Sequence, residues 1–217
     1  MELIDCLNDY VSNMEIDYAV CGGIAIDLFV GQKTRPHKDL DVSVYWEDRD
    51  KIVQFMLNDG WDIFEPCGCE HLHKINNIKD QKRVKTNIWC VRRTNPHYEF
   101  IEQDKDMFSV SFDGSEQTQL DFIEYLFNNR NSEHFIYARN HSIKRELGDA
   151  ILKTKDIMYL APEVVLLYKS KSFNNPDHQH DFDISLPKMN KSQTEWLKNA
   201  LVEMFPEGHE WLEKIEG

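Results

Sequence analysis

The sequence lacks any long hydrophobic run, and no stretch approaches the roughly 18 apolar residues that a membrane-spanning helix needs. The N-terminal stretch MELIDCLNDYVSNM has neither the basic start nor the apolar core of a signal peptide. Repeats and low-complexity tracts are missing as well. We therefore expect a cytoplasmic protein that does not enter a membrane.

Cysteine is scarce, and its number is odd. The five cysteines, at positions 6, 21, 67, 69 and 90, show no paired framework and suit a reducing compartment. Cys21 and Cys90 lie in apolar runs, where a buried thiol is the ordinary expectation. Neither is a candidate nucleophile.

Positive charge is also in short supply. With 25 Lys and Arg against 38 Asp and Glu, the net charge of −13 would repel a nucleic acid unless a strong basic patch overcame it. A cationic or neutral small acceptor is easier to accommodate. Acidic residues gather between 99 and 124, either as a solvated loop or as a binding wall for a polyamine; both interpretations stay open.

The 217 residues are enough for one compact domain or two small lobes, and 41% hydrophobic with 29% charged residues is ordinary for a globular protein. Apolar spacing predicts helices over 2–14, 24–30 and 49–57, and strands over 18–21, 40–45, 61–64, 87–91, 107–112, 119–127 and 135–138. The turn Asp113-Gly114-Ser115 predicts a hairpin between two of these strands. We expect a mixed sheet.

Beyond about residue 155 the pattern becomes helical. Pro162 and Glu163 suit the first turn of a helix, where a missing N–H costs nothing and a negative charge complements the dipole. Ser192 and Glu195 have the spacing of a capping box ahead of a helix that ends near Met204.

The segment GGIAIDLFVGQKTRPHKDLDVSVY, residues 22–45, carries the chemistry. Side chains alternate along a strand, so Asp39 and Asp41 project from one face, where two carboxylates suit Mg²⁺. Gly22 and Gly23 have no Cβ, so their backbone can approach a triphosphate at the N-terminus of the following helix. Asp-x-Asp by itself is a weak motif that often marks a solvated strand end; the glycines in front of it favour a metal and nucleotide site.

This segment resembles the signature of the DNA polymerase β-type nucleotidyltransferase superfamily, in which Gly-Gly or Gly-Ser precedes a strand bearing two acidic residues. It is most similar to the aminoglycoside 2''-adenylyltransferases and related small-molecule nucleotidyltransferases. The matching positions are Gly22, Gly23, Ala25, Ile26, Asp27, Gly31, Thr34, Arg35, His37, Asp39 and Asp41. Residues 87–90, 159–171 and 180–183 resemble bacterial members of the same group, whereas 61–120 shows no match.

The resemblance implies an α/β (α+β) fold, with a mixed sheet flanked by helices and a small C-terminal helical lobe. We place a nucleotidyltransferase core over 1–150 and the helical lobe over 151–217. The implied activity is metal-dependent transfer of AMP from ATP to a hydroxyl of a small molecule, such as an aminoglycoside-like or lincosamide-like antibiotic, with release of pyrophosphate. A nucleotide-binding regulator or antitoxin-like protein without turnover is the alternative.

The resemblance also implies roles for single residues. Asp39 and Asp41 would bind Mg²⁺, and a further carboxylate would complete the metal set or serve as the base. We choose Asp121, because a charge inside the apolar run TQLDFIEYLF is costly unless it is compensated; Glu124, on the opposite face, is the weaker candidate, and a solvent-facing Asp121 is the alternative.

Cations for the phosphates are the second implied set. Arg35 offers a bidentate guanidinium, and Lys169 and Lys171 offer compact charges on the second lobe. His37 matches the family motif and would touch substrate or orient its loop. Asp27 matches too, and would fix the short helix through a backbone or arginine contact.

Two other clusters contain residues that commonly bind metal ions. Cys67, Cys69, His71 and His73 alternate along an expected strand, and at roughly 3.3 Å per residue they are spread too far for one tetrahedral zinc ion. The acidic and histidine residues of 177–183 follow an Asn-Pro start typical of a loop. A structural interpretation is preferred for both.

Overall fold

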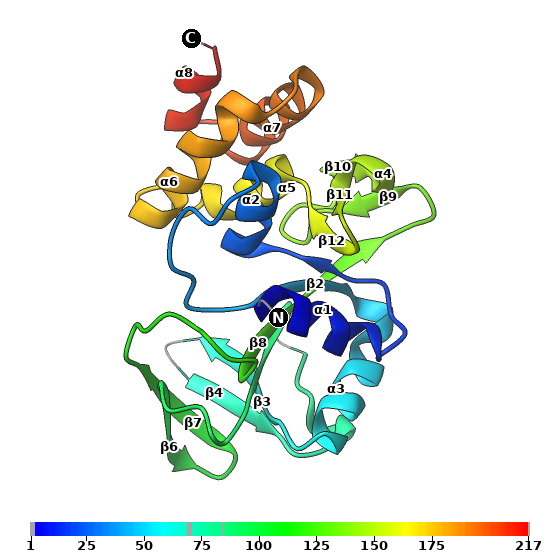
Figure 1. Ribbon diagram of the computed structural model, residues 1–217, viewed down its shortest axis with the longest axis vertical. Coiled ribbons are helices and arrows are strands. Elements are labelled where there is room, and N and C mark those ends of the chain that lie inside the picture. The colour runs from blue at the N-terminus through cyan, green and yellow to red at the C-terminus, as the bar shows by residue number, and fades with distance from the viewer. Residues whose placement is uncertain (1–2, 69–70, 84, 217) are drawn as a thin grey trace. The chain divides into compact units, whose positions relative to one another are not determined.

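The computed structural model describes residues 3–68, 71–83 and 85–216, and the chain forms two compact units (Figure 1). The strand-rich unit comprises the described residues up to Ala19 together with Arg35–Asn129. The helix-rich unit comprises Val20–Thr34 together with the described residues from Arg130 onward. The boundary between these units does not lie at residue 150. The division into a nucleotidyltransferase core over 1–150 and a helical lobe over 151–217 stays a prediction.

Among its described residues, the strand-rich unit contains two α-helices, two short 3-10 helices and most of the strands. Its elements are α1 (Leu3–Ser12), β2 (Asp41–Tyr45), η1 (Trp46–Asp48), α3 (Arg49–Asn58), β3 (Asp62–Gly68), β4 (His71–Ile75), η2 (Ile78–Asp80), β5 (Asn87–Val91), β6 (Tyr98–Asp104), β7 (Met107–Phe112) and β8 (Phe122–Arg130). The helices predicted over 2–14 and 49–57 are confirmed as α1 and α3.

The sheet of this unit is mixed, as the sequence predicts. Its strand order is β2-β8-β5-β3-β4-β7-β6, in which β2 is parallel to β8 and the remaining neighbours are antiparallel. Because side chains alternate along a strand, Val42, Val44 and Tyr125 project from the same face of the sheet, and all three are fully buried. The hydroxyl of Tyr125 donates to the sulfur of Met56 on α3 over 3.6 Å. Helix α3 therefore covers this face.

The hairpin expected at Asp113-Gly114-Ser115 is wrong. Strand β7 pairs with β6 and β4, whereas β8 pairs with β5 and β2, so the two strands flanking this turn are not partners. The hairpin lies one step earlier, between β6 and β7, which Figure 1 shows in green beside β4. Strand β6 was not predicted, because its sequence YEFIEQD has no sustained apolar alternation; most of its residues are exposed.

The helix-rich unit combines short strands with the remaining helices. Its elements are α2 (Gly22–Val30), β9 (His134–Ile136), β10 (Lys144–Glu146), α4 (Leu147–Ala150), β11 (Ile151–Thr154), β12 (Ile157–Leu160), α5 (Pro162–Ser170), α6 (Pro176–Ser185), η3 (Leu186–Lys188), α7 (Lys191–Met204) and α8 (Glu210–Glu216). Strand β1 (Ala19–Val20), at the boundary, pairs in parallel with β12 through Val20 and Tyr159.

Helices α2, α5, α6 and α7 pack on one another around a core that includes Leu166, Phe182 and Leu197. Pro162 occupies the first turn of α5, as expected. The capping box expected at Ser192 and Glu195 is wrong by two positions: Asn190 caps α7, and Gln193 completes the box. Ser192 with Glu195 and Asn190 with Gln193 are both three residues apart, so the spacing alone does not decide which pair begins the helix. No helix in the described part of the chain is both long and apolar enough to cross a membrane.

Candidate active site

The two acidic residues of the motif lie where the sequence predicts, at the start of β2. Asp39 precedes the strand and Asp41 is its first residue. Leu40 and Val42, which alternate with them, are 1% and 0% exposed and face the core. Burial of these apolar side chains fixes the opposite orientation of the two carboxylates.

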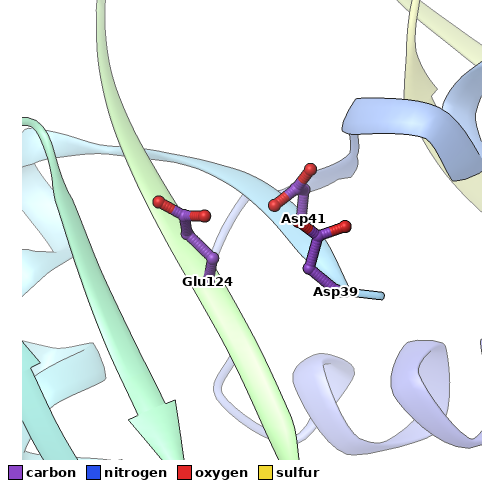
Figure 2. A group of neighbouring side chains, drawn as sticks. All are labelled: Asp39, Asp41 and Glu124. Carbon is purple, nitrogen blue, oxygen red and sulfur yellow. The ribbon is translucent and has the colours of Figure 1, made fainter. Parts of the chain in front are cut away.

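A third carboxylate joins them from the neighbouring strand. In the parallel pairing of β2 with β8, Asp41 lies opposite Glu124, and the backbone N–H of Glu124 donates to the carbonyl of Leu40 over 2.9 Å. Carboxylate oxygens of Asp39, Asp41 and Glu124 all lie within 4.8 Å of one another. Figure 2 shows the three side chains extending to the same side of the two strands.

Glu124 is held in place by its other neighbour. Asn87 on β5 donates from Nδ2 to Oε1 of Glu124 over 2.5 Å. Burial raises the pKa of Glu124 to about 7; the hydrogen bond from Asn87 opposes that rise, and the negative charge of Asp39 adds to it. The carboxyl group is thus balanced between its protonated and ionised forms near neutral pH.

Three carboxylates at this spacing fit a divalent cation. Like charges held this close repel one another, and a hard cation with oxygen ligands removes that cost. Among residues 3–68, 71–83 and 85–216, this is the one group of three or more histidine, cysteine or acidic side chains close enough to hold a metal ion. Cys67, His71 and His73 do not form such a group, and Cys69 lies outside the described residues.

The chain is similar to proteins of known family and fold. Residues 3–66 match the family model described as aminoglycoside-2''-adenylyltransferase, which includes the glycine and acidic motif. No curated protein sequence matches the chain. Two of the solved structures that match the chain are similar to it in fold. The lincomycin-bound lincosamide antibiotic adenylyltransferase LnuA is 14% identical with a TM-score of 0.52, covering 83% of this chain and 92% of LnuA. The antibiotic-resistance factor ANT(2'')-Ia is 12% identical with a TM-score of 0.53, covering 94% of this chain and 92% of that chain.

The chain has a nucleotidyltransferase fold. The predicted fold class, a mixed sheet flanked by helices with a helical C-terminal segment, is confirmed, and so is the resemblance to the aminoglycoside 2''-adenylyltransferase-like nucleotidyltransferases.

Asp121, the third acid expected from the sequence, is not a member of the group formed by Asp39, Asp41 and Glu124. Asp121 precedes β8 and is 9% exposed. Its carboxylate accepts from Nε2 of Gln117 over 3.4 Å, and burial raises its pKa while the charge of His97 opposes the rise. The geometry therefore favours Glu124 over Asp121 as the third carboxylate.

Glu124 ranks below Asp121 in the sequence analysis because the sequence does not give the strand register. Asp121 and Glu124 are three residues apart, so alternation places them on opposite faces of any strand that holds both. Which face carries Asp41 depends on the pairing of β2 with β8. The signal in the sequence was an acidic residue, Glu124, in a run of aromatic and aliphatic residues. It becomes specific only with the strand pairing, which sets Glu124 opposite Trp89 on β5 and beside Asp41 on β2.

The glycine turn belongs to the helix-rich unit. Gly22 opens α2 with a φ of 64°, a left-handed conformation that favours glycine over residues with a Cβ. Asp27 on the same helix accepts from the backbone N–H and the hydroxyl of Thr34, over 3.0 and 2.6 Å. This explains Asp27 as a residue that fixes the loop after α2. Binding of phosphate by Gly22 and Gly23 stays a prediction.

Arg35 and His37 lie in the strand-rich unit, on the loop that leads to Asp39. Nη1 of Arg35 donates to the carbonyl of Pro36 over 3.1 Å. His37 is 8% exposed, and its carbonyl accepts from the N–H of Gln117 over 2.8 Å. His37 thus anchors the loop, and contact of either side chain with nucleotide stays a prediction.

The predicted phosphate-binding lysines lie in the helix-rich unit. Lys169 on α5 forms an ion pair over 2.9 Å with Asp181 on α6, a residue that is 0% exposed. Lys171 follows α5 and lines an open groove of 560 Å³ with Phe173 and His209. The charge of Lys169 is already compensated by a buried carboxylate, and Lys171 shares its groove with Glu207, Glu210 and Glu213. Binding of phosphate by either lysine stays a prediction.

Proposed function

We propose that this chain transfers AMP from ATP to a hydroxyl group of a small-molecule antibiotic and releases pyrophosphate. The observation that carries the proposal is the convergence of Asp39, Asp41 and Glu124 within 4.8 Å, at the position of the family motif. The match to the aminoglycoside-2''-adenylyltransferase family and the fold of an adenylyltransferase bound to lincomycin support it.

The three carboxylates divide into two roles. Asp39 and Asp41 would hold Mg²⁺, which when bound supplies positive charge to the triphosphate and to the in-line displacement. Glu124, with its pKa raised to about 7, is suited to accept a proton near neutral pH. The other predicted site residues, Gly22, Gly23, Arg35, His37, Lys169 and Lys171, would bind the nucleotide.

The reaction balances with these groups. The acceptor hydroxyl oxygen forms a bond to the α-phosphorus of ATP, and the bond from that phosphorus to the bridging oxygen of the β-phosphate breaks. Pyrophosphate leaves with that electron pair, and the hydroxyl proton passes to Glu124. The hydrogen bond from Asn87 and the pairing with β2 hold Glu124 in one position, which supports its role as the proton acceptor.

The alternative of a nucleotide-binding regulator without turnover is not favoured. That alternative predicts that the third carboxylate is missing, and Glu124 supplies one. A nucleic acid acceptor remains disfavoured by the net charge of −13. The cytoplasmic location stays a prediction.

A pyrophosphate-release assay tests the proposal. Lincomycin and tobramycin would be offered with ATP or GTP and Mg²⁺, and mass spectrometry of the acceptor would detect the added nucleotide. We expect release with ATP from the wild-type chain, loss of at least about 100-fold in Asp41→Asn, and no loss in Asp50→Asn, an exposed acid on α3 that pairs with Arg83. Undiminished release by Asp41→Asn, with the cooperative unfolding of the wild type, would overturn the assignment.

A further inference from the structure

Asp39 lies just outside the strand pairing that fixes the other two carboxylates. Strand β2 begins at Asp41, which is paired with Glu124 on β8. Asp39 belongs to the irregular segment in front of β2. The position of its carboxylate relative to Glu124 is therefore set in part by contacts outside the regular sheet.

Gln117 supplies such a contact. Its backbone N–H donates to the carbonyl of His37, two residues ahead of Asp39, over 2.8 Å. On the other side of Asp39, the carbonyl of Leu40 accepts from the N–H of Glu124 over 2.9 Å. These two hydrogen bonds hold the segment that carries Asp39 at both of its ends, and both donors come from the segment that forms or precedes β8.

The side chain of Gln117 closes the turn that leads into β8. Nε2 donates to the carbonyl of Phe122, the first residue of β8, over 2.7 Å, and to the carbonyl of Gln119 over 2.9 Å. A longer contact of 3.4 Å joins it to Oδ1 of Asp121. Gln117 is only 8% exposed, so these hydrogen bonds lie in low-dielectric surroundings, where they are stronger than in water. Residues 117–122 therefore form a closed turn.

Gln117 thus bonds to both segments at equivalent places. His37 is two residues before Asp39, and Phe122 is two residues before Glu124. The backbone of Gln117 holds the first segment, and its side chain holds the second. A shift of one segment relative to the other would therefore break one of these hydrogen bonds.

We propose that Gln117 is a positioning residue of the acid cluster, by which we mean Asp39, Asp41 and Glu124. It holds the segment of Asp39 in place against the start of β8, so that the three carboxylates keep the spacing that a divalent cation requires. The inference rests on the cation site of the proposed function. Groups that hold the ligands of a metal ion in one geometry contribute to its affinity, although they do not touch the ion themselves.

Binding of Mn²⁺ tests the assignment without relying on turnover. Mn²⁺ takes the same oxygen ligands as Mg²⁺, and electron paramagnetic resonance of the free ion gives its dissociation constant for the nucleotide-free chain. Gln117→Met has a side chain of similar length without the amide, so the backbone contact to His37 remains and the contact to Phe122 is lost. We expect this variant to bind Mn²⁺ about tenfold more weakly than the wild type.

Gln119→Met is the matched control. It makes the same substitution two positions along the same segment, where the side chain is exposed and the carbonyl that accepts from Gln117 is kept. Its dissociation constant for Mn²⁺ should stay within about twofold of the wild type. Asp41→Asn should lose most of the Mn²⁺ binding, which would show that the measured ion lies at the acid cluster.

Thermal unfolding without cation separates positioning from stability. If Gln117→Met lowers the unfolding temperature and leaves the dissociation constant of Mn²⁺ unchanged, the side chain only stabilises the turn and the inference is overturned. Equal weakening by Gln117→Met and Gln119→Met, or binding that survives in Asp41→Asn, overturns it too. If Gln117→Met does not unfold cooperatively, Gln117→Asn replaces it; its side chain is one methylene shorter and too short to reach both carbonyls, so weaker binding is again expected.

The outcomes separate this inference from the proposed function. If the expected pattern of Mn²⁺ binding holds and the wild type releases no pyrophosphate, the role of Gln117 is supported and the proposed transfer is overturned. If pyrophosphate is released and Gln117→Met binds Mn²⁺ like the wild type, the transfer stands and Gln117 is not a positioning residue. A wild type that binds no Mn²⁺ overturns the inference in either case.

Discussion

Asp41 and Glu124 lie opposite one another on the parallel strands β2 and β8, although they are far apart in the sequence. With Asp39 they form a group of carboxylates within 4.8 Å that the surrounding sheet holds in place. Like charges at this distance would separate if the backbone allowed it. The sheet therefore maintains a geometry that a cation can stabilise.

The first prediction distinguishes the two candidates for the third carboxylate. Glu124→Gln should lower kcat for nucleotide transfer by at least about 100-fold, because it removes the proton acceptor beside the cation site. Asp121→Asn should lower it by less than about threefold, since the hydrogen bond from Gln117 can be kept by an amide oxygen. Steady-state kinetics of both variants, with ATP and acceptor varied separately, make the comparison.

A larger loss in Asp121→Asn than in Glu124→Gln would restore Asp121 as the third acid. Circular dichroism of both variants shows whether the fold has been preserved.

The second prediction concerns pH and divalent cations. The pKa of Glu124 is raised in the folded chain from 4.5 to about 7, so its contribution to stability is present below pH 4.5 and is lost as pH rises through 7. Without divalent cation, Glu124→Gln should therefore unfold at a temperature about 5 °C above the wild type at pH 8, with a smaller difference at pH 5. Thermal unfolding at the two pH values measures this.

Mg²⁺ should raise the unfolding temperature of the wild type at pH 8, because it compensates the three carboxylates, and should raise that of Glu124→Gln less. A variant less stable than the wild type at pH 8 without cation would contradict the assigned burial of Glu124.

The third prediction concerns a buried ion pair in the strand-rich unit. Arg49 and Glu65 have side chains that are 0% exposed, and Nη2 of Arg49 donates to Oε1 of Glu65 over 2.7 Å. The guanidinium also lies 4.4 Å from the ring centroid of Phe127. Burial lowers the pKa of Arg49 to about 10, and the charge of Glu65 opposes that shift.

Removing one partner leaves a buried charge without compensation. Glu65→Leu or Arg49→Met should each lower the free energy of unfolding by about 3 kcal/mol or more, and the double variant should lose less than the sum. Urea unfolding of the four proteins completes the cycle. Additive losses would mean that the two side chains contribute independently.

Much of the local structure could be predicted from the sequence. The spacing of Leu7 and Val11 predicts α1, and the alternation of Leu40 and Val42 with Asp39 and Asp41 predicts the orientation of the two acids. These features depend on the period of a helix or strand, which the residues themselves set. Predictions were wrong where two residue pairs fitted the same pattern equally well, as at the start of α7, where two pairs had the spacing of a capping box.

The sequence by itself determined that Asp39 and Asp41 share one face of a strand, because adjacent side chains in extended backbone point to opposite sides and the apolar ones must be buried. Only the tertiary structure decided that Glu124 completes the group and that Gln117 joins the start of its strand to the segment of Asp39. Those neighbours come from β8 and the segment before it, and strand pairing between distant segments is set by packing of the whole sheet rather than by any local pattern.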